Sequence, residues 1–202
     1  MGVYFNPSNA SFRQAKNSRI YVDKTKLIEY LNDRLSTEDK CLAVSHARRF
    51  GKSHAAGMID AYYSLGCDST ELFDGTKISE SADYKKYMNK YNVIQERVCK
   101  DFKKKYNDTL DYSQDLYLLI QEIYEITNTQ FVIIIDEWDC VIRNSDDKEL
   151  VHEYLQFLHS LFKSEESKSF LALAYITGIL PIKKIKDESA LNNFKEYTML
   201  DS

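Results

Sequence analysis

Three short apolar runs divide the chain and predict buried strands. They cover residues 41–45, 131–135 and 170–176, and none of them alternates apolar with polar positions. Continuous apolar runs of this length are typical of parallel strands that are covered on both faces of a sheet. A weaker strand is predicted over residues 91–94, and residues 20–23 are expected to form a short extended segment.

Between these runs, apolar residues recur every three or four positions, which predicts helices. Residues 24–35 place Leu27, Ile28, Leu31 and Leu35 on one face. Further helices are predicted over residues 52–65, 95–106, 113–126 and 146–162, the last opened by a capping box of Asp146 and Glu149. Residues 1–19 are polar, and we expect them to be irregular.

Apolar strands separated by helices favour an α/β fold with a mostly parallel sheet and helices on both faces. In such sheets, ligands bind at the carboxyl ends of the strands. The polar clusters of interest follow Ser45, Ile135 and Ile176, where three predicted strands end. The sequence therefore predicts that these clusters meet at one edge of the sheet.

Composition narrows the classes of function. A chain of 202 residues is long enough for one domain, and its net charge of -4 argues against a broadly basic nucleic-acid-binding surface. No apolar run approaches the roughly 20 residues of a membrane helix, and the N-terminus lacks the pattern of a signal peptide. The four cysteines are far apart, so we expect free thiols and a cytoplasmic protein.

The segment from Ser45 to Ser53 has the character of a phosphate-binding loop between a strand and a helix. Gly51, Lys52 and Ser53 match the end of the pattern G-x-x-x-x-G-K-[ST], although His46 stands at its first glycine. The glycine lets the backbone approach phosphates, the lysine reaches the β- and γ-phosphates of ATP, and the serine hydroxyl can ligate Mg²⁺. The alternative is a basic helix start without a ligand, where Arg48, Arg49 and Lys52 would oppose the helix dipole.

Two carboxylates end the apolar run at residues 131–135. Asp136 is a candidate Mg²⁺ residue, and Glu137 is a candidate for orienting the attacking water. An acidic strand exit into solvent is the alternative. Nearby, Asp139 is expected to be an ordinary loop residue and Trp138 a packing residue rather than a stacking platform for adenine. Thr177, at the end of the next strand, either contacts the γ-phosphate or water, or caps a turn.

Several blocks of the chain together resemble the bacterial AAA-ATPase-like family. They are Tyr-Val-Asp-Lys-Thr at 21–25, Arg-Arg-Phe-Gly-Lys-Ser at 48–53, Ile-Ile-Asp-Glu-Trp-Asp-Cys at 134–140, Thr-Gly-Ile-Leu-Pro-Ile-Lys-Lys at 177–184 and Ser-Ala-Leu-Asn-Asn-Phe at 189–194. The resemblance implies a three-layer P-loop NTPase sandwich near the STAND and archaeal ATPase groups, with ATP and Mg²⁺ as cofactors. It places Arg48, Arg49, Phe50, Gly51, Lys52 and Ser53 at the nucleotide, Ser53 and Asp136 at the metal, Glu137 as the catalytic acid and Thr177 as a sensor.

Three departures from the family qualify this interpretation. His46 and Ala47 replace an Arg-Pro pair in the loop. The chain is shortened after residue 94, so part of one strand is expected to be missing. It ends at residue 202, before the helical lid and nuclease-like domain that such proteins carry. We therefore divide it into residues 1–40, which lead into the core, and residues 41–202, a truncated P-loop NTPase core.

Three functions remain open at this point. The first is Mg²⁺-dependent ATP hydrolysis. The second is a degenerate nucleotide-binding module with negligible turnover, which the altered loop and the missing lid favour. The third is an interaction domain in which the acidic and basic clusters pair with each other, since 15 tyrosines suit contact surfaces for self-association or a partner protein.

Overall fold

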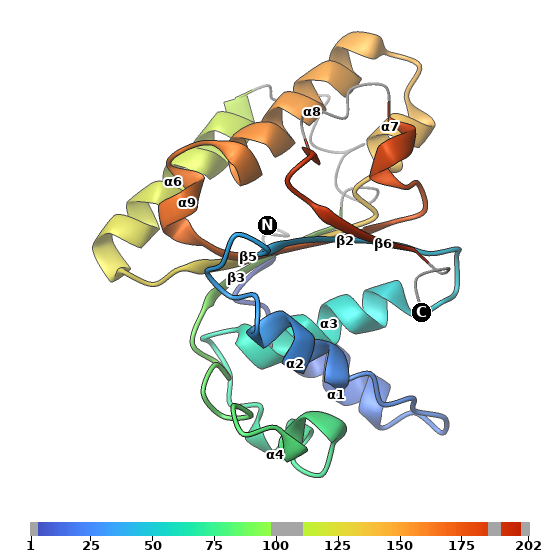
Figure 1. Ribbon diagram of the computed structural model, residues 1–202, viewed down its shortest axis with the longest axis vertical. Helices are drawn as coiled ribbons and strands as arrows, with labels where there is room; N and C mark the ends of the chain where they lie inside the picture. The colour runs from blue at the N-terminus through green and yellow to red at the C-terminus, as the bar shows by residue number, and fades with distance from the viewer. Residues whose placement is uncertain (1–3, 98–110, 186–190, 199–202) are drawn as a thin grey trace.

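The computed structural model describes residues 4–97, 111–185 and 191–198. In these residues, six strands form one sheet in the order β1-β3-β4-β5-β2-β6 (Figure 1). β1 pairs with β3 in antiparallel fashion, and the other described pairings are parallel. The strands are β1 Tyr4–Phe5, β2 Cys41–Ser45, β3 Asn92–Arg97, β4 Phe131–Asp136, β5 Leu171–Gly178 and β6 Lys195–Thr198.

Helices cover both faces of this sheet, so the predicted three-layer α/β sandwich is confirmed (Figure 1). On one face lie α1 Ala10–Lys16, α2 Lys26–Asn32, α3 Lys52–Tyr63 and α4 Thr70–Phe73, with the 3-10 helix η1 at Lys77–Glu80 contacting α2. On the other lie α6 Asp111–Thr127, α7 Cys140–Asn144, α8 Lys148–Lys163 and α9 Ser167–Phe170. A second 3-10 helix, η2 Ile182–Lys184, follows β5.

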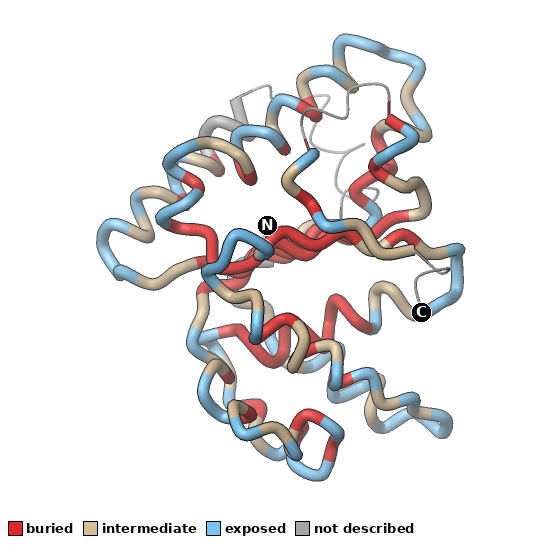
Figure 2. Tube along the Cα trace, viewed as in Figure 1, coloured by how far each residue is buried: buried red, intermediate tan, exposed pale blue. Residues whose placement is uncertain are grey.

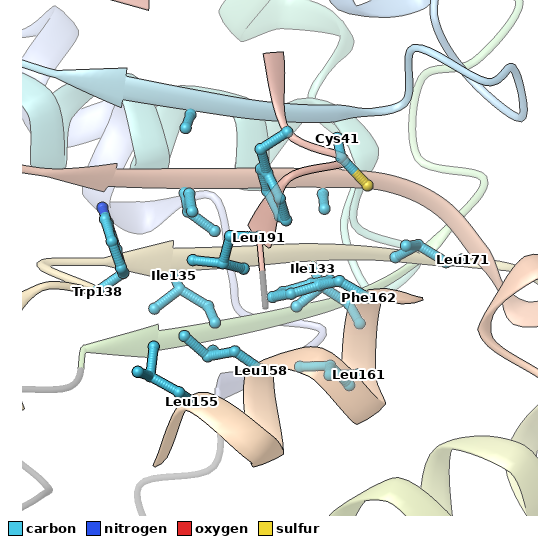
Figure 3. Close-up of a cluster of buried hydrophobic side chains, with 14 of the residues drawn as sticks. Cys41, Ile133, Ile135, Trp138, Leu155, Leu158, Leu161, Phe162, Leu171 and Leu191 are labelled. Carbon is cyan, nitrogen blue, oxygen red and sulfur yellow. The ribbon is translucent and has the colours of Figure 1, made fainter. Parts of the chain in front are cut away.

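The core has two halves, one on each face of the sheet, and the residues of β4 alternate between them. Ile133 and Ile135 pack in the cluster that includes α8, as the close-up in Figure 3 shows. Val132 and Ile134 pack in the cluster that includes α3. Both faces are therefore buried (Figure 2), which explains why β4 is an unbroken apolar run. The same alternation directs Asp136 toward the face that carries α3.

The N-terminal segment is more regular than the sequence predicts. Residues 1–19 were expected to be irregular, yet β1 and α1 lie within them. Phe12 of α1 is buried and stacks on Phe73, with the ring centroids 4.8 Å apart. A single buried aromatic anchors this short helix, so its apolar periodicity is too weak to detect in the sequence. Residues 20–23, expected to be extended, belong to no strand.

β3 corrects two expectations. The strand that the shortened sequence placed in doubt has six residues, and it pairs with β4 along its whole length. Residues 95–97 were expected to begin a helix but belong to this strand, and the rest of that predicted helix lies outside the described residues. Gln95 is buried in the sheet, so tertiary pairing overrides its weak strand propensity.

The cap of α8 and the state of one cysteine differ from the sequence predictions. The cap of α8 is Asp147 rather than Asp146, because Asp147 Oδ1 accepts hydrogen bonds from the N–H groups of Glu149 (3.0 Å) and Leu150 (3.2 Å). Cys41 and Cys67 are free thiols, whereas Cys140 is disulfide-bonded, so the prediction of free thiols is wrong for Cys140; Cys99 lies outside the described residues. Among the helices described, none has both the length and the apolar character to cross a bilayer.

Candidate functional site

The loop between β2 and α3 has an unusual backbone. Arg49 has a φ of +69° and Gly51 a φ of +76°, while Phe50 between them has the ordinary negative φ. Alternating signs of φ direct successive N–H groups into one concavity, which is a backbone arrangement suited to anions. A side chain at Gly51 would be strained by this φ, and its Cβ would lie 2.9 Å from the Lys24 Nζ.

Lys52 and Lys24 hold the loop from two sides. Lys52 Nζ donates hydrogen bonds to the carbonyl oxygens of His46 and Ala47, each at 2.9 Å. Lys24 Nζ donates to the carbonyl oxygen of Phe50 at 3.0 Å. Three carbonyl groups of the loop thus accept hydrogen bonds from two lysine ammonium groups, and the Phe50 side chain is exposed.

The acidic strand end meets the start of α3. Ser53 Oγ donates a hydrogen bond of 2.5 Å to Asp136 Oδ2. Asp136 is only 2% exposed, and its Oδ1 has no hydrogen-bond partner in the described part of the chain. The structure therefore brings together the two clusters that the sequence separates by more than eighty residues.

Glu137 lies where the chain turns away from β4. Its φ is +60°, a left-handed conformation, and its side chain is exposed. The turn is fixed by the Trp138 N–H, which donates to the Thr177 carbonyl at 3.2 Å, and by the Cys140 N–H, which donates to the Glu137 carbonyl at 2.9 Å. The two neighbouring carboxylates consequently differ, since Asp136 is buried against α3 and Glu137 is open to solvent.

Thr177 lies near the end of β5, between β2, which leads into the loop, and β4, which ends at Asp136. β5 is inserted between β2 and β4, and Thr177 is in register with Val44 on one side and Asp136 on the other. Registered residues of neighbouring parallel strands point to the same face, so the Thr177 hydroxyl is on the α3 side with Asp136. Thr177 is fully buried, and its Oγ1 has no partner among the described residues.

Asp139 has a role that the sequence did not indicate. It was expected to be an ordinary loop residue, yet it is fully buried and its Oδ2 accepts hydrogen bonds from Arg143 Nε (2.6 Å) and from the N–H groups of Ile179 (3.1 Å) and Leu180 (2.8 Å). Asp139 therefore ties the chain after β4 to the chain after β5. A Cβ at Gly178 would lie 2.7 Å from Asp139 Oδ1, so a glycine is needed at this crossing.

Trp138 and His46 are packed residues at the edge of the site. Trp138 is fully buried and its carbonyl accepts a hydrogen bond from the Tyr154 hydroxyl, so it packs in the core as predicted. The His46 ring is stacked with Phe50, with centroids 6.3 Å apart. Burial lowers the pKa of His46, and the nearby Lys52 and Lys24 ammonium groups lower it further. His46 is therefore neutral at pH 7, unlike an arginine.

Comparison with known proteins gives a family for this chain. The sequence profile of the family described as predicted AAA-ATPase matches residues 10–98 and 94–186. These two matches cover most of the chain. The chain belongs to the AAA-ATPase-like family.

Other comparisons of the AAA-ATPase-like chain are more distant. Among solved structures, it is similar to PCH-2 of C. elegans, with 13% sequence identity and a TM-score of 0.43. The alignment covers 93% of this chain and 40% of PCH-2, so the chain spans less than half the length of that protein. No curated protein matches the chain.

The side-chain oxygens at this site suit a metal ion that takes most of its ligands from a nucleotide and water. Among the described residues, no three His, Cys, Asp or Glu side chains gather into a metal site of their own. Mg²⁺ differs from other metals because it is usually bound through one or two protein oxygens together with substrate phosphates and water. Ser53 Oγ and Asp136 Oδ1, which has no partner among the described residues, supply such oxygens, so the residues present suit Mg²⁺ bound with a nucleotide.

Proposed function

We propose that this AAA-ATPase-like chain binds Mg·ATP between the loop at residues 46–53 and the end of β4, and hydrolyses it. The observation that carries the proposal is the 2.5 Å hydrogen bond between Ser53 and Asp136. It brings the serine of the predicted phosphate loop to the acid at the end of β4, and a serine and an aspartate are the protein residues that hold Mg²⁺ in P-loop NTPases, which supports the proposal.

Each residue has a distinct role in this proposal. The backbone around Gly51 and the first turn of α3 bind the phosphates, because N–H groups without helical partners point out of a helix start. Lys52 moves from the two loop carbonyls to the β- and γ-phosphates. Ser53 and Asp136 would hold Mg²⁺, which would neutralise phosphate charge. Phe50 shields the phosphates from solvent.

The exposed Glu137 is placed to orient or deprotonate the attacking water, because it lies at the strand end beside the metal-binding pair. Among the described residues, the buried hydroxyl of Thr177 has no hydrogen-bond partner, and it lies on the same face as Asp136, which suits a contact with the γ-phosphate or that water. Arg48 and Arg49, both exposed on the loop, contact phosphate or a neighbouring protein molecule.

Charge around the loop also supports an anionic ligand. Lys24, Arg48, Arg49 and Lys52 all lie in or against the loop before α3, where cations oppose the helix dipole by about 0.3–1 kcal/mol each. Among the described residues, the salt bridges do not involve any of these four side chains. A bound triphosphate would turn this unfavourable arrangement into a favourable one.

A second candidate function is nucleotide binding without turnover. It is favoured by His46, which is neutral where the family has an arginine, and by Lys52, whose ammonium group is already bonded to the loop. Glu137 and Thr177 would then have no role in chemistry. The division at residue 40, the cytoplasmic location and partner binding stay predictions under either function.

The test is calorimetric titration of Mg·ATP into the purified chain and into Lys52→Ala, with phosphate release measured in parallel. We expect binding by the parent chain and none by Lys52→Ala. Glu137→Gln should bind Mg·ATP as the parent chain does and lose about 10²- to 10⁴-fold in turnover. Equal binding by the parent and Lys52→Ala would move the site elsewhere, and binding without phosphate release by the parent would establish the second function.

A further inference from the structure

We propose that this chain associates with further copies of itself, head to tail, through two apolar surfaces of opposite charge. The inference concerns contact between protein molecules and does not depend on nucleotide binding. The first surface, which we call the basic surface, consists of Arg19, Ile20, Val22, Lys24, Arg49 and Phe50. The second, which we call the acidic face of α6, consists of Leu118, Leu119, Glu122, Glu125 and Ile126.

Exposed apolar residues are concentrated on these two surfaces. Among the described residues, eight large hydrophobic residues are exposed, and six of them belong to the basic surface or to the acidic face of α6. The exposed fractions of these six residues run from 49% to 83%. Single exposed hydrophobic residues are normal on a protein surface, whereas hydrophobic residues gathered into patches mark sites of interaction.

The basic surface has an apolar centre and exposed cations around it. Ile20, Val22 and Phe50 line one cavity beside α1, and Lys24 and Arg49 belong to the same lining. Arg19, which precedes this group in the chain, is exposed, as are the other two cations. In the part of the chain that the structure describes, the salt bridges do not involve any of the three cations.

One carboxylate lies within the basic surface but is bonded inside the molecule. Asp23 is half-buried, and its Oδ1 accepts hydrogen bonds from the N–H group (2.8 Å) and the hydroxyl (2.7 Å) of Thr25. Its Oδ2 accepts from the N–H group of Lys77 at 2.9 Å. With three exposed cations against this one acid, the basic surface keeps a net positive charge.

The acidic face of α6 follows from the periodicity of the helix. α6 packs one side against the core through Leu116 and Ile120. The residues of the acidic face lie on the opposite side, because residues three, four or seven positions apart share one face of a helix. From Asp111 to Thr127, the helix contains no lysine or arginine. The salt bridges among the described residues involve neither of its two exposed glutamates.

The two surfaces complement each other in apolar character and in charge. An apolar centre surrounded by charged residues is the usual anatomy of a protein interface, and opposite charges orient the two partners. The surfaces cannot meet within one molecule, because α6 and the start of α3, which follows the loop, lie on opposite faces of the sheet (Figure 1). A second copy of the chain is therefore the occupant that both surfaces fit.

A contact between two different surfaces leaves one of each unoccupied at the ends of a pair. Further copies can add to these ends, so head-to-tail contacts build rings or open chains. The competing arrangement is a symmetric pair, in which α6 packs on α6 of a second copy. A two-fold axis would then set acidic residues such as Glu122 and Glu125 against acidic residues, and like charges across an interface are destabilising.

Sedimentation velocity of the full chain without nucleotide tests the inference. Chain concentrations from about 1 µM to about 1 mM include the affinities of small, transient interfaces. The variant Ile20→Gln/Val22→Gln removes apolar anchors from the basic surface, and Leu118→Gln/Ile126→Gln removes them from α6. All four positions are exposed, so both variants should fold, which circular dichroism checks. Leu65→Gln is the matched control, because this exposed leucine lies outside both surfaces.

We expect the parent chain to form pairs and larger assemblies as its concentration rises. Each double variant should associate at least tenfold more weakly, and Leu65→Gln should behave as the parent does. An equal mixture of the two double variants should form one-to-one pairs and nothing larger, because each variant supplies the surface that the other lacks. Raising the salt concentration from about 0.05 M to about 0.5 M should weaken association, since salt screens opposite charges.

Other outcomes overturn the inference in distinguishable ways. A parent chain that stays monomeric over the whole range would remove self-association. Association that strengthens with salt and is lost only in Leu118→Gln/Ile126→Gln would establish symmetric pairing of α6 instead. Absence of pairs in the mixture, or equal weakening by Leu65→Gln, would show that these two surfaces do not meet. None of these results alters the calorimetric test of Mg·ATP binding, so the two proposals fail independently.

Discussion

Glu137 combines an unfavourable backbone conformation with a position beside the proposed metal pair. Its φ of +60° is left-handed, which costs an ordinary L-residue roughly 1–2 kcal/mol. Residues held in such conformations cluster at active sites, where the surrounding structure imposes them. Here the imposing contacts are the backbone hydrogen bonds from Trp138 to Thr177 and from Cys140 to Glu137.

Replacing Glu137 should therefore change the stability of the folded protein in a direction that depends on the new residue, while turnover is lost in every case. Glu137→Gly should leave the free energy of unfolding unchanged or raise it by up to about 1 kcal/mol, since relief of the left-handed strain is partly offset by the greater entropy of glycine in the unfolded chain. Glu137→Val should lower it by about 1 kcal/mol or more, because a β-branched residue tolerates this φ poorly. Both variants should lose turnover. Urea denaturation measures the stabilities, and a Glu137→Gly variant less stable than Glu137→Val would contradict the argument.

At this scale, the sequence predicts residues whose spacing is itself the signal. Gly51-Lys52-Ser53 and Asp136-Glu137 are contiguous and follow apolar runs, so their meeting could be predicted. Lys24 and Asp139 could not be assigned their contacts, because Lys24 bonds to the backbone of Phe50, and Asp139 to that of Ile179 and Leu180. Hydrogen bonds to backbone groups that are distant in the chain produce no recognisable pattern in the amino-acid sequence. The only sequence signal for Lys24 and Asp139 is that they lie within the segments that resemble the family, residues 21–25 and 134–140.

The α3 helix carries an acid in its buried interior. Residues 55–63 of α3 are buried, and Asp60 among them is 2% exposed, with its Oδ1 unpartnered among the described residues. Burial raises the pKa of Asp60 to about 8. In the folded protein, Asp60 is therefore protonated at neutral pH, whereas in the unfolded chain it ionises near pH 4.

This difference predicts how stability depends on pH. Because the pKa of Asp60 is raised in the folded protein, its contribution to the free energy of unfolding is fully present below about pH 4 and is lost as the pH rises toward about 8. Asp60→Asn cannot ionise, so its stability relative to the parent should increase between pH 5 and 8, by at most about 1.4 kcal/mol per pH unit. Urea denaturation at pH 5, 6, 7 and 8 measures the difference. A difference that stays constant with pH would show that Asp60 is not protonated in the folded protein.

Elements with a strong apolar pattern were predicted well, and those defined by tertiary contacts were not. The sequence predicts β2, β4 and β5 well because both faces of these strands are buried, so their residues form continuous apolar runs. β3 extends through Gln95, Glu96 and Arg97 because β4 pairs with it, and α1 forms around the single buried residue Phe12. In both cases, the stabilising partner lies far away in the chain.

The proposed site joins the ends of β2, β4 and β5 to the start of α3, so a ligand should stabilise the packing of these elements against one another. Binding only to the folded state contributes about 2.7 kcal/mol at a ligand concentration of one hundred times Kd. For a chain of this size, roughly 2–4 °C per kcal/mol predicts that Tm rises by about 5–11 °C with Mg·ATP. Scanning calorimetry with and without Mg·ATP measures this shift. Lys52→Ala should show no shift, and an equal shift in that variant would argue against the loop as the binding site.

At the scale of the molecule, the order of strands was beyond prediction. The sequence indicates a mostly parallel sheet, but it contains no signal that β5 lies between β2 and β4. That placement decides that Thr177 is the neighbour of Asp136, because strand order and register are set by packing of the completed fold. The end-of-strand rule nevertheless predicted that the three polar clusters share one edge.

The strand order also governs what becomes of a divided chain. A gene split between β3 and β4 would put Lys52 on one polypeptide and Asp136 on the other, while the sheet alternates strands of the two halves as β1-β3, then β4-β5, then β2, then β6. Neither half could form a continuous sheet alone. The first half lacks β4 and β5, which lie between β3 and β2, and the second half lacks β2, which lies between β5 and β6. Reassembly of the two polypeptides and recovery of nucleotide binding would consequently be one event, which makes this fold a natural scaffold for reporting on proximity between two fused proteins.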